Sequence, residues 1–249
     1  MRTYSAIPRA QYREQPRRMP RCLSFERYAL GFNGSTNYVD CGNDESLNIT
    51  DAITIEAWVK PFDWGENDYG RIVDKGKFAF ALNNPNLRFY GIFSSHNGVW
   101  VTPFSELNKW SHVVVVYDFN PVNDPVFYIN GEEKSVSEIE TPSGTLEDHS
   151  SDNLLIGNRQ ELDRTFNGLT ALVRIYGDYA LTPEEVRWNM LNYHNPVHPE
   201  KLVLWLPMEE GSGLTVYDKS GHGNNGSLLP ADDPPTWERV RQYEIRASV

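Results

Sequence analysis

The stretch KWSHVVVVYDFNPVNDPVFYINGEEK, residues 109–134, decides the fold of this chain. Residues 113–117 form an unbroken run of β-branched and aromatic residues, which favours an extended strand buried on both faces. Residues 126–129 form a second such run, and Asn130-Gly131 after it supplies the positive φ values of a tight hairpin turn. Two antiparallel strands with no helix between them predict an all-β sandwich.

Further segments of strand length surround this hairpin, each bounded by Gly, Asn or Pro. They are YALGFNGSTNYVDCGN (28–43), ITIEAWVKP (53–61), RIVDKG (71–76), FAFAL (78–82), LRFYGIF (87–93), VWVTPF (99–104), LLIGN (154–158), LTALVRIYG (169–177) and LVLWLPM (202–208). We expect a glycine-rich loop system after them and a polar tail beyond Pro230. The sequence therefore predicts a single jelly-roll β-sandwich of two antiparallel sheets over residues 29–249.

One short helix is predicted within this β-sandwich. Thr182 is its N-cap, Pro183 occupies the first helical position, and Glu185 is the capping-box partner. We expect Val186, Met190 and Leu191 to form its apolar side, and Asn195-Pro196 to end it.

Residues 1–28 have no hydrophobic period and predict an extended, basic N-terminal arm. With Arg27, six further arginines give it a charge of +5 against two glutamates, which leaves −16 on the rest of a chain of net charge −11. We expect these six to act in assembly: Arg2, Arg9, Arg13, Arg17, Arg18 and Arg21. Such an arm can lie on an acidic neighbour or on phosphate, or remain a solvated tail. We expect no specific nucleic-acid partner.

The sequence also bears on compartment. No apolar run approaches the roughly 20 residues needed to span a bilayer, and the N-terminus lacks the apolar centre of a signal peptide. The cysteines, Cys22 and Cys41, flank the expected first strand, where they are either two separate core residues or a disulfide.

Seven segments in register resemble the laminin-G-like, pentraxin-like branch of the concanavalin A-like lectin/glucanase superfamily. They are LGFNGSTNYVDCG, ITIEAWVKP, KWSHVVVVYD, VFYINGE, LLIGN, FNGLTALVRIYGDYALTPEEV and LVLWLPMEEGSGLTVYDKSGHGNNG, and they span residues 30–228. In that family the EEGSG segment usually precedes FNGSTNYV, whereas here it follows the helix. The order therefore resembles a circularly permuted module, or one whose first strand is replaced by the arm.

The resemblance implies calcium as a candidate cofactor. The family commonly has an Asp-Glu pair two residues before the Arg of the LTALVRIY strand, but Ala171 and Leu172 stand there in this chain. Asp218, Asn224 and Asn225 of the glycine-rich loop are the remaining metal candidates, because calcium requires six to eight oxygen ligands. Alternatively, the Asp218 carboxylate caps the turn without a metal.

The resemblance also raises the question of catalysis. A glucanase of this superfamily needs carboxylates that alternate along one strand, and no Glu-x-Asp-x-x-Glu pattern is present. Glu138 and Glu140 are the nearest equivalent, and we expect them at the edge of a solvated loop. His112 lies at the start of a buried strand, where a structural role is more common than a catalytic one.

Aromatic residues beside polar ones predict a ligand-binding surface. One expected loop holds Trp64, Asn67, Asp68 and Tyr69, and another holds His96, Asn97 and Trp100. Sugar rings stack on aromatic faces, and lectins pair these with Asn and Asp. Trp and Tyr are equally enriched at protein interfaces, so glycan and protein ligands both remain open.

These patterns together predict a non-enzymatic structural and binding module. The function we expect is that of a virion surface protein that decorates a capsid, docks through its arm on itself or on a capsid protein, and binds host glycans. A stand-alone carbohydrate-binding lectin is the alternative, and a glycoside hydrolase the third. We expect a virion location, or otherwise a cytoplasmic or extracellular one without a recognisable signal peptide.

Overall fold

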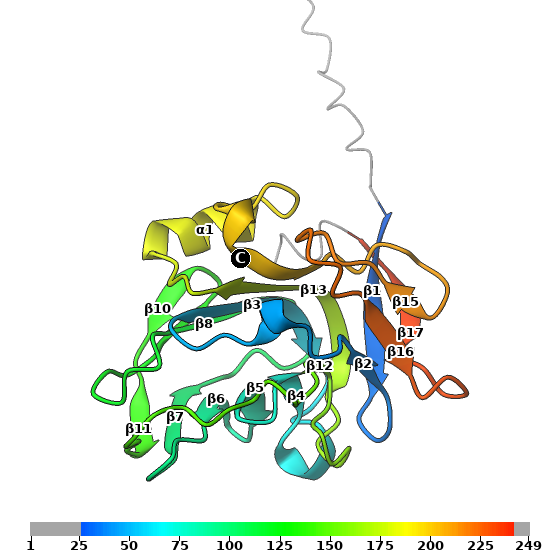
Figure 1. Cartoon of the computed structure of the whole chain (residues 1–249). Helices are drawn as coiled ribbons and strands as arrows, with labels where there is room; N and C mark the ends of the chain where they lie inside the picture. Colours follow the sequence, from blue (N-terminus) through cyan, green and yellow to red (C-terminus); the bar gives the residue numbers. More distant parts are fainter. Residues whose placement is uncertain (1–25, 242–249) are drawn as a thin grey trace, which may run out of the picture.

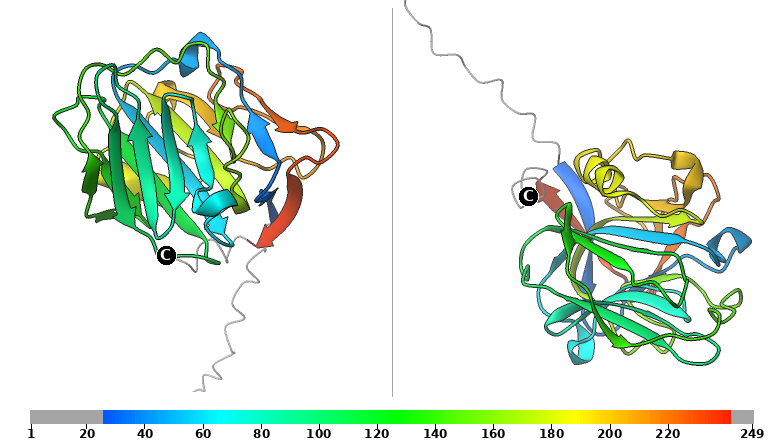
Figure 2. Two further views of the ribbon diagram at one scale, coloured as in Figure 1. Left: turned by 90° about the horizontal axis from the view of Figure 1, so that it is seen from below. Right: turned by 90° about the vertical axis from the view of Figure 1, so that its left-hand side faces the viewer.

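The computed structural model describes residues 26–241, which form two antiparallel sheets packed face to face (Figures 1 and 2). Sheet A has the order β10 (Glu132–Lys134), β9 (Val126–Ile129), β8 (Ser111–Tyr117), β3 (Ile53–Pro61), β13 (Asn167–Gly177), β1 (Glu26–Asn33) and β17 (Thr236–Arg241), with β14 (Leu202–Leu206) also paired to β13. Sheet B has the order β11 (Ser137–Glu140), β7 (Gly98–Pro103), β6 (Asn86–Gly91), β5 (Phe78–Asn83), β4 (Arg71–Asp74), β12 (Leu155–Ile156), β2 (Tyr38–Asp40), β16 (Gly226–Leu229) and β15 (Thr215–Val216). The predicted jelly-roll β-sandwich is confirmed.

The hairpin that decides the fold lies in sheet A, where β8 is next to the central strand β3 and β9 is next to the edge strand β10. Every residue of β8 is buried, because β3 and β9 pair with its two edges and both of its faces are covered. Asn130 and Gly131 have φ values of 53° and 74°, as the two-residue turn requires. Val115 is fully buried and Ile129 nearly so, which confirms that they face other strands.

The core between the sheets follows the two-residue alternation of the strands. In β6, Leu87 and Phe89 enter the core, while Arg88 and Tyr90 lie on the outer face of sheet B. Strand β3 departs from a simple in-and-out pattern, because eight of its nine residues are buried. Helix α1 (Pro183–Leu191) lies on the outer side of sheet A and covers that face of β3 (Figure 1).

Helix α1 begins as predicted, with the Thr182–Glu185 capping box complete and Pro183 in the first turn. Its predicted apolar side is only partly right: Val186 is buried, but Leu191 is 65% exposed. Asn189 is fully buried in its place, because the sheet surface beneath the helix carries polar groups that need a partner.

Three segments differ from the sequence prediction. The tail beyond Pro230 is not simply polar loop, because β17 pairs with six residues of β1. Glu138 and Glu140 belong to an edge strand, β11, rather than to a loop. Strand β1 begins at Glu26, inside the range predicted as arm, and the six assembly arginines and Cys22 lie outside the described residues. The short 3-10 helices are η1 (Glu45–Leu47), η2 (Glu66–Asp68) and η3 (Pro199–Lys201).

Candidate functional site

The two predicted aromatic loops lie at opposite ends of sheet B. In the first loop, the carbonyl of Asp68 accepts a hydrogen bond from the amide of Asn84, which follows β5. The second loop joins β6 to β7 and begins after Gly91, which pairs with Phe78 at the other end of β5. The structure therefore does not bring the residues of the two loops into one site.

The tryptophans of these loops pack against the core between the sheets. Trp100 was predicted to lie outside the core, and this placement is wrong, since its side chain is fully buried. Its ring stacks on Phe89 and contacts Tyr117, and its indole N–H donates to Asp124 at 2.8 Å. The even-numbered side chains of β7 point into the core, so neither face of the Trp100 ring is open to a sugar. Trp64 is half-buried and packs edge-on against Phe104.

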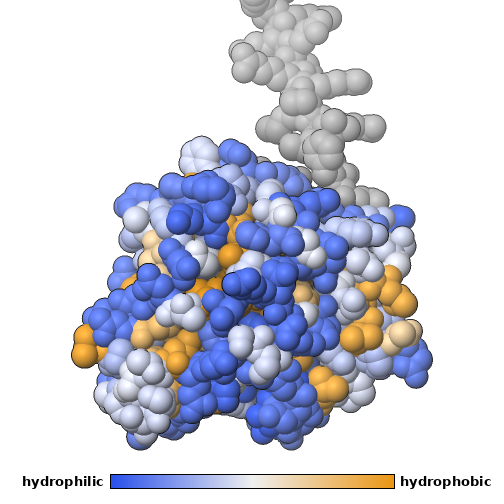
Figure 3. Space-filling view, viewed as in Figure 1, coloured by the Kyte–Doolittle hydropathy of each residue, from blue (hydrophilic) through white to orange (hydrophobic). Residues whose placement is uncertain are grey.

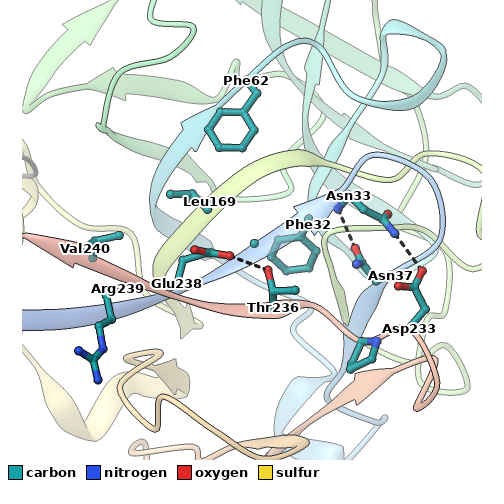
Figure 4. Close-up of a pocket in the computed structure, with 12 residues that line it drawn as sticks. Phe32, Asn33, Asn37, Phe62, Leu169, Asp233, Thr236, Glu238, Arg239 and Val240 are labelled. Atoms are coloured by element: carbon teal, nitrogen blue, oxygen red, sulfur yellow. Dashed lines mark hydrogen bonds between the residues drawn. The ribbon is translucent and has the colours of Figure 1, made fainter.

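A hollow of about 460 Å³ at the end of sheet A has the composition expected of a ligand site (Figure 4). We call it the rim pocket. Its lining comes from β1, β13, β17 and the segments that follow β3 and precede β17, and it includes Gly31, Asn33, Phe62, Leu169, Asp233, Thr236 and Glu238.

The backbone register explains why the surface is hollow here. Gly31 of β1 pairs with Thr236 on one side and with Leu169 on the other. A Cβ atom at Gly31 would lie 2.7 Å from Thr236 Oγ1 and 3.3 Å from Glu238 Cγ, so only glycine leaves this floor low. Phe62 follows the last residue of β3, and its ring is 43% exposed above the floor.

Hydrogen bonds fix the two carboxylates of the rim pocket. Asp233 Oδ2 accepts from Asn33 Nδ2 at 3.1 Å and from Thr36 Oγ1 at 2.7 Å, and Asn33 is held in turn by the amides of the Gly34–Thr36 turn. Glu238 Oε1 accepts from Thr236 Oγ1 at 3.1 Å. Within residues 26–241, the other oxygen of each carboxylate accepts no hydrogen bond. These two oxygens are oriented acceptors for a ligand's hydroxyl groups.

Sequence analysis missed the rim pocket because β17 carries no clean alternation. Trp237 packs against the core between the sheets, whereas Val240 packs on the outer face of sheet A. Without that strand, Asp233 and Glu238 look like part of a polar tail. The sequence did offer one signal, the turn from Asn33 to Asn37, because no hydrogen-bond partner was predicted for its polar side chains.

A second polar cluster lies under α1 and is sealed. The Glu56 carboxylate accepts from Arg174 Nη1 at 2.8 Å, His112 Nε2 at 3.1 Å and Asn189 Nδ2 at 2.9 Å, and all four side chains are fully buried. Burial alone would raise the pKa of Glu56, but these donors outweigh it and hold that pKa below its usual value. With no route for a ligand, His112 has the structural role that the sequence favoured.

The glycine-rich loop uses its acidic side chain internally. Asp218 Oδ1 accepts from the amides of Trp205 and Ser220, and Oδ2 accepts from the Ser220 hydroxyl and the amide of Asn224. Four hydrogen bonds saturate the carboxylate, and Asn225 Oδ1 is bound by the Asp218 amide. As arranged, Asp218, Asn224 and Asn225 do not fit calcium, and no cluster of three His, Cys, Asp or Glu suited to a metal occurs within the described range.

The remaining candidates lie at the surface or in the core. Glu138 and Glu140 are exposed on the edge strand β11. Cys41 is buried, and burial raises the pKa of its thiol. Hydrophobic side chains occur in small groups among hydrophilic ones on the face seen in Figure 3. Between residues 26 and 241, no helix has the length and apolarity needed to cross a membrane.

Comparisons with known proteins place this fold. The sequence matches the description "Concanavalin A-like lectin/glucanases superfamily" over residues 33–187, more than half of its length, and the chain belongs to this superfamily. The inferred resemblance is thereby confirmed. No curated protein sequence matches the chain.

Two solved structures show the same fold. One is from Bacteroides ovatus and is described as a candidate carbohydrate binding protein, with 22% identity, a TM-score of 0.61, and coverage of 81% of this chain and 58% of the other. This chain thus spans little more than half of that protein. The other is a native heptameric SAP-like pentraxin from Limulus polyphemus, with 17% identity, a TM-score of 0.50, and coverage of 78% and 93%.

Proposed function

We propose that this chain is a non-enzymatic carbohydrate-binding module that takes a sugar in the rim pocket. The observation that carries the proposal is the exposed ring of Phe62 beside Asp233 and Glu238, two fixed carboxylates that each keep one open oxygen. The volume of about 460 Å³ is within the usual range for small-ligand sites.

The chemistry of the rim pocket suits a neutral sugar. A pyranose has an apolar face of C–H groups that packs on an aromatic ring, and hydroxyl groups at its edge that donate to carboxylates. Hydrogen bonds to an ionised acceptor are the stronger kind, so Asp233 and Glu238 would orient the sugar while Phe62 holds its face. The Bacteroides ovatus neighbour, described as a candidate carbohydrate binding protein, supports this class of ligand.

The same carboxylates are poorly suited to hydrolysis. A glycosidase keeps one carboxyl group protonated by placing it in a partly apolar pocket, with the partner rigidly held across the sugar. Asp233 and Glu238 are both exposed, and Glu138 and Glu140 on β11 are exposed as well. This supports binding without turnover.

The proposal is tested by a glycan array followed by calorimetry on the best ligand. Phe62→Ala and Asp233→Asn should each weaken binding about tenfold, since each removes a main contact. Trp188→Ala is the matched control, because Trp188 is 47% exposed on α1, away from the rim pocket, and should leave affinity unchanged. Equal affinity of Phe62→Ala and wild type would refute the rim pocket as the sugar site.

We also propose, from the charge distribution, that the N-terminal arm docks the module into an assembly such as a virion surface. The support is the +5 of the arm against the −16 of the remainder, an attraction screened over about 8 Å at physiological salt. Deletion of residues 1–25 leaves β1 whole and should abolish assembly, and Arg→Gln changes at the six arginines should do so at unchanged length. Salt-insensitive assembly in sedimentation or electron microscopy would contradict the proposal.

A further inference from the structure

The outer face of sheet B carries a cluster of two arginines and two tyrosines that the rim pocket does not use. The backbone register aligns Arg71, Ala81 and Arg88 in one row across β4, β5 and β6. Ala79 and Tyr90 lie in the next row. Figure 2, left, shows these strands from outside. Because Ala81 is the residue between them in this row, no long side chain of β5 separates Arg71 from Arg88.

Tyr69, from the end of the first predicted loop, completes the arginine–tyrosine cluster (Tyr69, Arg71, Arg88 and Tyr90). The guanidinium carbon of Arg71 lies 4.2 Å from the centre of the Tyr69 ring and 5.0 Å from that of Tyr90. Arg88 lies 5.0 Å from the same Tyr69 ring. Two cations therefore contact one aromatic ring, and the aromatic rings hold them without neutralising their charge.

The N–H groups of these arginines are incompletely used. Arg71 is 2% exposed, and its Nε donates to Asp74 at 3.0 Å, but its Nη1 is buried without a partner among residues 26–241. Arg88 Nε is likewise buried and unpartnered within that range, and Arg88 Nη1 reaches Asn83 Oδ1 only at 3.5 Å.

A neighbouring arginine, Arg159, shows by contrast how an arginine pairs with acceptors of this chain. Arg159 donates to both oxygens of Asp163, at 2.5 and 3.0 Å, and also pairs with Glu161 at 3.3 Å. Buried N–H groups normally find acceptors. The open ones of Arg71 and Arg88, unlike the equally unpartnered Arg174 Nε under α1, lie on a face that no α-helix of residues 26–241 covers, which is why we assign them to an acceptor from outside the described residues.

We propose that the arginine–tyrosine cluster binds the carboxylate or sulfate group of an acidic sugar. Planar guanidinium groups match such oxyanions in a bidentate manner, and the tyrosine rings offer faces for the sugar that carries the group. The cluster has two arginines against the single carboxylate of Asp74, so one positive charge remains. Because the chain as a whole is −11, recognition would depend on these local contacts and not on long-range attraction.

Arg88 is the more accessible arginine of the cluster. Its side chain is half-buried, and its hydrogen bond to Asn83 is long, at 3.5 Å, so it can turn toward a ligand at the loss of that one bond. The site shares no residue with the rim pocket and does not rest on the proposed function.

Calorimetry with the full chain tests the inference. The probes are an oligogalacturonate, a sulfated galactan oligosaccharide, a neutral galactan oligosaccharide and sodium sulfate. We expect one of the two acidic oligosaccharides to bind, which also tells carboxylate from sulfate. Arg88→Gln should weaken this binding about tenfold, and Arg88→Lys should also weaken it, because the point charge of lysine lacks the planar fork.

Arg187→Gln is the matched control: it removes one positive charge from α1, on the other sheet, and should change affinity less than about twofold. The Nε–H resonance of Arg71 should shift on binding, which gives a readout without altering a buried side chain. The inference is overturned if neither acidic oligosaccharide binds or if free sulfate binds as tightly as the oligosaccharide. It is also overturned if Arg88→Gln and the control Arg187→Gln weaken binding equally. Phe62→Ala should leave acidic binding intact, so failure here is separable from failure of the rim pocket.

Discussion

Each sheet has an arginine and a carboxylate on its outer face, but the two pairs are used differently. On sheet A, Glu56 and Arg174 are fully buried under α1, and the carboxylate accepts from three side chains. On sheet B, Asp74 is bonded to Arg71, whose Nη1 is buried without an acceptor in the described part of the chain. Among residues 26–241, no α-helix covers that face (Figure 2).

We infer that this difference in cover separates a structural ion pair from the recognition surface proposed on sheet B. Within residues 26–241, both pairs leave an arginine N–H group without an acceptor, Arg174 Nε on sheet A and Arg71 Nη1 on sheet B. The pairs therefore differ in what covers them, and a pair that is covered specifies which element packs on it. Where bonds are left open near a surface, they are available to a ligand. In this molecule α1 covers the ion pair on sheet A, whereas the two proposed binding sites, the rim pocket and the arginine–tyrosine cluster, lie away from α1.

The largest expected effect is from breaking the sealed pair. Glu56→Gln leaves the Arg174 guanidinium buried without its counter-charge, which should cost about 3–5 kcal/mol in the free energy of unfolding. Urea denaturation measures this, with Glu138→Gln on the exposed edge strand as the control. A loss below about 1 kcal/mol would show that Glu56 is not the organising acceptor.

A smaller loss is expected at the contact between helix and sheet. Asn189 donates to Glu56 Oε2 at 2.9 Å and to the Tyr176 hydroxyl at 2.8 Å, and accepts from the amide of Val197 at 2.9 Å. Asn189→Ala leaves these groups unpaired and should cost about 1–3 kcal/mol. Hydrogen exchange should show opening of α1 before the rest of sheet A; uniform protection would argue against a separate role for this contact.

The contributions of Glu56 and Asp74 to the free energy of unfolding should change in opposite directions on acidification. The pKa of Glu56 is lowered, so its contribution to stability is present above its ordinary value of 4.5 and is lost as pH falls through the folded value. Burial raises the pKa of Asp74, and Arg71 opposes this only in part. Its ionised form therefore costs stability at neutral pH, and that cost fades as pH falls through the raised value.

Unfolding free energies from about pH 6 to about pH 2 measure this contrast. The gap between wild type and Glu56→Gln should narrow on acidification, whereas the stability of Asp74→Asn relative to wild type should fall. Shifts in the same direction would contradict the distinction between the two pairs.

The smallest effect on stability is expected in the arginine–tyrosine cluster on the outer face of sheet B. Arg88→Gln removes only one long hydrogen bond and should change the free energy of unfolding by less than about 0.5 kcal/mol, although it weakens acidic-sugar binding. A loss comparable to that of Glu56→Gln would make Arg88 a structural residue and sink its assignment to a ligand.

Local rules were sufficient for much of this fold. The run at residues 113–117, the Asn130-Gly131 turn and the capping box of α1 depend on neighbours in sequence, and all three are confirmed. The sealed cluster was not predictable, because its members are far apart in the sequence. Arg174 lies 118 residues after Glu56, and Asn189 lies 133 residues after it.

The candidate sites depended even more on contacts distant in the chain. Asp233 reaches Asn33 only because β17 pairs with β1, and the sequence of residues 236–241 does not predict a strand. Trp100 looked exposed because Trp is common at interfaces, but the bonds that hold it, to Asp124 and against Tyr117, come from another sheet and loop.

The most direct test of the account is chemical-shift mapping on the full ¹⁵N-labelled chain with the best neutral glycan from the array. We predict that the largest shifts surround Gly31, Phe62 and Asp233 in the rim pocket, and that α1 is unaffected. Largest shifts at Trp188 and Leu191 on α1, or at Glu138 and Glu140 on β11, would contradict the account, as would the absence of any glycan that binds.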